Sequence, residues 1–70
     1  MLSKLLMPEI ESLIAERQLS ILKEILSDWP PADIADLIID LPEHDKVIVF
    51  RVLSVDHATE TFEHLEFDTQ

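Results

Sequence analysis

Residues 29–65 read WPPADIADLIIDLPEHDKVIVFRVLSVDHATETFEHL, and their pattern is the main evidence for the fold. Prolines divide this stretch into short apolar segments. Pro31 and Pro42 each suit the start of a helix, because the first turn does not use the N–H that proline lacks. Asp33 and Glu43 follow these prolines closely, and negative charge is favourable near a helix N-terminus. The pattern predicts short helices that begin at prolines.

Apolar residues recur at helical spacing in these segments. One predicted helix has the apolar face Ile34, Leu37, Ile38 and Leu41, and the last has Ala58, Thr61, Phe62 and Leu65. Ser54 suits the N-cap of the last helix. A weak repeat relates these two faces at a spacing of 24, and such repeats are typical of stacked helical solenoids. We therefore predict an all-α fold.

Residues 47–53, VIVFRVL, are rich in β-branched side chains, which favours a strand. Their flanks are helical in type and the chain offers no second strand to pair with them, so we predict a buried helix. Trp29 continues the apolar stripe of residues 22–26 and is predicted to lie in the core, with an interface role as the alternative. Phe50 and Phe62 are predicted to be core residues by the same argument.

The first 28 residues contain two apolar stripes whose phase shifts near Gln18. We predict two helices with a kink there; one long helix is the alternative. The first helix is predicted to begin near Pro8, with Leu2–Met7 as a lead-in. At the other end of the chain, Phe67–Gln70 is predicted to be a connection.

The composition limits the function. Seventy residues make at most one small domain, and the chain has no glycine or cysteine, which excludes glycine-rich phosphate loops, disulfides and thiolate metal sites. No apolar run approaches the roughly 18 residues that span a bilayer, so we predict a soluble chain without membrane insertion. The chain also lacks tyrosine and shows no nucleophile with a base behind it, so we do not predict an enzyme.

The net charge is −10, and most of it lies late in the chain. Residues 29–70 have ten acids and two bases, a balance of −8, whereas residues 1–28 have five acids and three bases, a balance of −2. This acidity opposes binding to nucleic acid and to anionic membranes. Cations and basic protein surfaces are the expected partners.

The ordered motifs of residues 31–65 resemble the cytoplasmic N-terminal domain of MgtE-type magnesium transporters. In that family a P-A-D-x-A-D-L motif ending in L-P is followed by an x-x-x-F-R-x-L helix and an A-x-E-x-(apolar)-E-x-L helix. The matching residues are Pro31, Ala32, Asp33, Ala35, Asp36, Leu37, Leu41, Pro42, Phe50, Arg51, Leu53, Ala58, Glu60, Phe62, Glu63 and Leu65. The helix at residues 22–29 also fits, so the resemblance extends from about Met7.

The resemblance implies that residues 1–70 are part of an intracellular regulatory domain, a right-handed, α-solenoid-like superhelix of about five short helices here. It implies a place on the cytoplasmic side of the inner membrane, with CBS domains and a transmembrane domain in the same full-length protein, which would be a homodimer. In the family, Mg²⁺ bound between the N-terminal and CBS domains favours the closed pore. We also expect a fragment of such a solenoid to self-associate through its exposed apolar end.

Of the acidic ligands in this family, the resemblance places one in the chain, Glu60, as a possible Mg²⁺ ligand; Glu63, Asp56 and Asp36 are weaker candidates. Magnesium prefers oxygen ligands and keeps several waters, so one or two carboxylates on facing surfaces can hold it. Because the other half of such a site would be missing, Mg²⁺ binding by the 70-residue fragment alone is predicted to be weak or absent.

Three alternatives stay open at this point. The acidic residues could be no more than a solvated helix face. His57, Glu60 and His64 have the spacing i, i+3, i+7 and could chelate a transition metal from one helix. The chain could also be a free-standing acidic α-helical interaction module that docks a basic protein.

Overall fold

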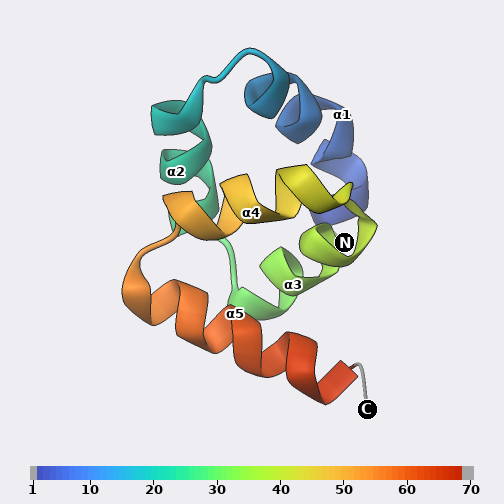
Figure 1. The fold of residues 1–70 in the computed structure, drawn as a ribbon, viewed down its shortest axis with the longest axis vertical. Helices are drawn as coiled ribbons and strands as arrows, with labels where there is room; N and C mark the ends of the chain where they lie inside the picture. Colours follow the sequence, from blue (N-terminus) through green and yellow to red (C-terminus); the bar gives the residue numbers. More distant parts are fainter. Residues whose placement is uncertain (1, 69–70) are drawn as a thin grey trace.

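The computed structural model describes residues 2–68, and the side chains of residues 5–65. Within residues 2–68 it has five helices and no strand, which confirms the all-α prediction. They are α1 (Leu2–Ala15), α2 (Leu19–Ser27), α3 (Pro31–Asp40), α4 (Glu43–Val52) and α5 (Val55–Asp68). In Figure 1, α1 and α2 form the upper part, α4 crosses the middle in front, and α5 forms the lower edge below α3. The right-handed superhelix stays a prediction.

One apolar core joins the first four helices. It consists of Ile10, Ile14, Leu22, Leu26, Trp29, Ile34, Leu37, Ile38, Leu41 and Val49. These residues include most of the apolar stripes read from the sequence, and the predicted core position of Trp29 is confirmed, with 5% of its surface exposed. A chain of this size depends on such burial, because its surface is large relative to its volume.

The predicted start of the first helix is wrong. Helix α1 begins at Leu2 and runs through Pro8, which lies in its interior. A proline there cannot donate the usual backbone hydrogen bond and costs about 3 kcal/mol. Leu6 and Met7 pack against the core, and this contact favours a helix that continues upstream of the proline.

The turn between α1 and α2 confirms two helices with a break near Gln18. It is a Schellman motif built without glycine: the Gln18 N–H donates to the Leu13 carbonyl at 2.9 Å, and the Arg17 N–H donates to the Ile14 carbonyl at 3.1 Å. Arg17 takes the left-handed conformation, with φ 58°. Its guanidinium also donates to the Ile14 carbonyl at 2.8 Å, which ties the side chain to the end of α1.

The later helices begin as the sequence predicts. Pro31 is the first residue of α3, and Pro42 is the N-cap of α4. Ser54 caps α5, since its Oγ accepts a hydrogen bond from the His57 N–H at 3.2 Å. Helix α5 continues through Asp68, so the predicted connection is wrong for its first two residues, and residues 69–70 lie outside the described part.

Two predictions about burial are wrong. The run 47–53 is helical through Val52, as predicted, but Val49 is its one fully buried residue and Val47 is 55% exposed. Phe50 is half-buried against the core, whereas Phe62 is 56% exposed. Helix α5 packs on α3 through the side that holds the buried Thr61, and its neighbour Phe62 lies about 100° around the helix from that line. The helical spacing was correct, but it does not fix how wide the covered face is.

Candidate cation-binding face

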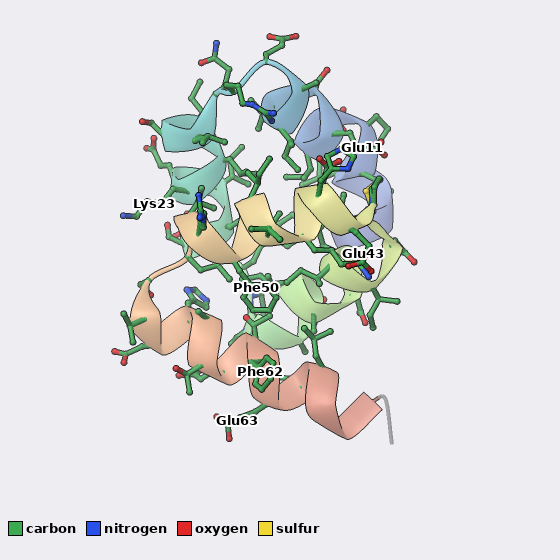
Figure 2. The ribbon with its side chains drawn as sticks, viewed as in Figure 1. Glu11, Lys23, Glu43, Phe50, Phe62 and Glu63 are labelled. Atoms are coloured by element: carbon green, nitrogen blue, oxygen red, sulfur yellow. The ribbon has the colours of Figure 1, made fainter. Side chains whose placement is uncertain are left out.

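The strongest candidate site from the sequence lies on α5. Asp56, Glu60 and Glu63 are all exposed and follow each other at i, i+4 and i+7. This spacing places the three carboxylates on one face of the helix. In Figure 2, Glu63 points outward from the lower side of the molecule. We call Asp56, Glu60 and Glu63 the acidic face of α5.

The acidic face has no cationic partner among the described side chains. Within residues 5–65, the two contacts between a basic and an acidic side chain lie at the start of α4, where His44 Nε2 is 3.2 Å from Asp45 and Lys46 Nζ is 3.5 Å from Glu43. Glu43, the acid of the lysine pair, is labelled on α4 in Figure 2. The three carboxylates of the acidic face are therefore open to an outside cation, and their mutual repulsion favours the binding of such a cation.

His57 faces inward and fixes α5 to the corner between α2 and α3. Its Nε2 lies 2.9 Å from the Trp29 carbonyl oxygen, 28 residues earlier in the chain. A carbonyl oxygen only accepts, so Nε2 donates the proton, and this nitrogen is not available to bind a metal. His64 is exposed on the same helix. The predicted transition-metal site of His57, Glu60 and His64 thus loses one of its nitrogen ligands.

The other acidic candidate, Asp36, lies on α3 and is half-buried. Among residues whose side chains are described, no three His, Asp or Glu converge closely enough to hold a metal ion by themselves. These residues therefore offer individual carboxylates on the surface and no preformed metal site. Such oxygen donors fit a hydrated Mg²⁺ ion, which needs one or two protein ligands on each surface.

Sequence reasoning missed the role of His57, although a signal was present. His57, Thr61 and Leu65 are spaced at i, i+4 and i+8, which is the spacing of one helical stripe. Thr61 is fully buried and Leu65 half-buried, so the stripe faces the protein interior. A histidine at the head of a buried stripe is more often a structural donor than a surface ligand.

The fold and the acidic face define a small all-helical, acidic module suited to cations or basic surfaces. Comparison with protein families matches residues 29–70 to the MgtE intracellular N domain. This match covers more than half of the chain, and the chain belongs to this family of intracellular domains from magnesium transporters. The resemblance read from residues 31–65 is confirmed.

Curated proteins and solved structures return no match to the chain. Among the described helices, none combines the length and hydropathy that crossing a bilayer requires.

Proposed function

We propose that the chain senses intracellular Mg²⁺ through the acidic face of α5 and helps to close the pore of a magnesium transporter. The observation that carries the proposal is the group of three exposed carboxylates on one helix face, with no ion pair to a described side chain. Membership of the MgtE intracellular N domain family supports the transporter context.

In this proposal Glu60 is the main protein ligand, with Glu63, Asp56 and Asp36 as weaker contributors. The ion keeps most of its waters and bridges Glu60 to a second acidic surface, supplied by the CBS domains of the same full-length protein. Without the ion, the two acidic surfaces repel each other. An ion that binds the closed arrangement better than the open one shifts the equilibrium towards closure.

The same reasoning sets the expected context. The CBS domains, the transmembrane domain and a second copy of the full-length protein are the proposed partners, with this chain on the cytoplasmic side of the membrane. The 70-residue chain alone is expected to bind Mg²⁺ weakly, because its described residues provide single carboxylates and no converging set. Residues 1–70 would then be one part of the regulatory domain.

The proposal is tested by Glu60→Gln in the cytoplasmic part extended through the CBS domains. This substitution keeps the size of the side chain and removes its charge, so the fold is expected to be unchanged. We expect Mg²⁺ affinity in isothermal titration calorimetry to fall at least about tenfold, which corresponds to about 1.4 kcal/mol.

The matched control is Glu24→Gln, an equally exposed acid on α2 that lies outside the acidic face. Its Mg²⁺ affinity is expected to stay within about twofold of the unsubstituted protein. Equal affinity in both variants would remove Glu60 from the proposed site.

A further inference from the structure

A second surface lies in the part of the chain that the family match does not cover. A groove of about 440 Å³ runs between α1 and α2. Its lining residues are Pro8, Glu9, Ser12, Leu13, Ile21 and Ile25. The match to the MgtE intracellular N domain begins at residue 29, so this groove is not explained by the family assignment.

The floor of the groove is apolar and open. Ile21 is 46% exposed, and Leu13 and Ile25 are half-buried at the edge of the core. Four of the six lining residues are apolar, and covering them with a partner is favourable because it removes apolar surface from water. Ile21 and Ile25 are one helical turn apart, so the floor is about 6 Å long on the α2 side.

The rim of the groove is acidic. Glu9 lines it on the α1 side. On the α2 side, Glu24 and the C-cap residue Asp28 follow Ile21 at i+3 and i+7 and are both exposed, which places them beside Ile21, just outside the lining residues. The nearest base on α2, Lys23, points away from α1 in Figure 2. An apolar floor with acidic edges is complementary to a ligand that is apolar in the centre and basic at its sides.

We propose that this groove binds a basic amphipathic helix of a partner protein, with two apolar side chains at i and i+4 seated between α1 and α2. Helices that bind in grooves use anchors at this spacing. Their flanking Lys or Arg residues would face Glu9, Glu24 and Asp28. This interaction is separate from the proposed magnesium role on α5 and does not depend on it.

Charge argues against the other occupants. A second copy of this chain carries −10, so the acidic rim would face a strongly acidic molecule. Anionic lipid surfaces and nucleic acids meet the same repulsion. The proposed basic helix of a partner protein supplies positive charge opposite this rim.

The test uses two labelled synthetic peptides of the same composition, made of Ala and Lys with two Leu. One peptide places the two Leu at i and i+4, and the other places them at i and i+2, on different sides of the helix. Fluorescence anisotropy at about 0.15 M salt, where long-range attraction is screened, measures their binding to the 70-residue chain. We expect the first peptide to bind at least tenfold more tightly than the second.

Two variants and one control variant locate the site. Ile21→Ser is expected to weaken binding of the first peptide at least tenfold. Ile39→Ser on α3 is the matched control, because Ile39 is 48% exposed but lies outside the groove, and it is expected to change binding less than twofold. Glu9→Lys, at an exposed position, should weaken binding without touching the core. Circular dichroism checks that each variant is folded.

Several outcomes would overturn the proposal. Equal binding of both peptides would show attraction by charge alone, and equal effects of Ile21→Ser and Ile39→Ser would exclude the groove. Failure of both peptides to bind would also reject it. Self-association in sedimentation that disappears with Ile21→Ser would assign the groove to a second copy of the chain instead.

Discussion

The turn that connects α1 to α2 contains an arginine in the left-handed conformation, whereas α3, α4 and α5 each follow a proline or serine N-cap. The first pair carries its proline inside α1 and makes its turn with Arg17 at φ 58°. The later helices begin after Pro30, Pro42 and Ser54, and backbone N–H groups of the first turn of each helix donate hydrogen bonds to the carbonyls of these residues. Local sequence signals are therefore strong in the second region and weak in the first.

The two regions share a core but present different surfaces. Ile10, Ile14, Leu22 and Leu26 from the first region belong to the same buried cluster as the residues of α3. Outside this core, the first region exposes an apolar groove and the second an acidic helix face. Stability is therefore shared across the chain, whereas the two proposed binding surfaces are separate.

The largest expected effect tests whether the two regions are one folding unit. Leu22→Ala and Leu37→Ala each truncate a fully buried leucine, one in each region, and each should lower the free energy of unfolding by about 2–5 kcal/mol. Thermal unfolding followed by circular dichroism should show one transition, shifted down in both variants. Two transitions, or a Leu22→Ala variant that unfolds like the parent, would separate the regions.

A smaller effect is expected at the hydrogen bond between His57 of α5 and the Trp29 carbonyl, at the corner between α2 and α3. His57→Ala removes the donor to the Trp29 carbonyl and should lower the free energy of unfolding by about 1 kcal/mol. Urea unfolding can be followed by the emission of Trp29, the only tryptophan in the chain. His64→Ala, on the exposed side of α5, should change stability by less than about 0.5 kcal/mol. Similar losses in both variants would mean that this hydrogen bond adds nothing to stability.

The smallest effect concerns the turn of the first region. Arg17→Gly relieves a left-handed conformation that costs a non-glycine residue about 1–2 kcal/mol, but it also loses the hydrogen bond to Ile14. We expect a net gain of about 0.5 kcal/mol in denaturant unfolding. Lys23→Gly, in the middle of α2, should instead lose about 1 kcal/mol. A loss in both variants would show that the arginine side chain stabilises the turn more than its backbone strains it.

Much of the second region could be predicted from residues alone. Pro31 and Asp33 marked the start of α3, Ser54 marked the cap of α5, and Glu60 was expected on an exposed face. These features depend on interactions within one helical turn, which sequence spacing describes well. The buried position of Thr61 was also expected, but its Oγ1 finds no hydrogen-bond partner among the described atoms, which spacing does not reveal.

The order of the residues already showed where most helices begin, which of their faces are apolar, and that the chain is acidic. The packing of the helices against one another decided that α1 continues through Pro8, that Phe62 stays exposed, and that His57 reaches the Trp29 carbonyl. It also decided that Ile21 lines a groove. The physical reason is that caps and apolar stripes act over a few residues, whereas burial and long-range hydrogen bonds depend on how the helices cross.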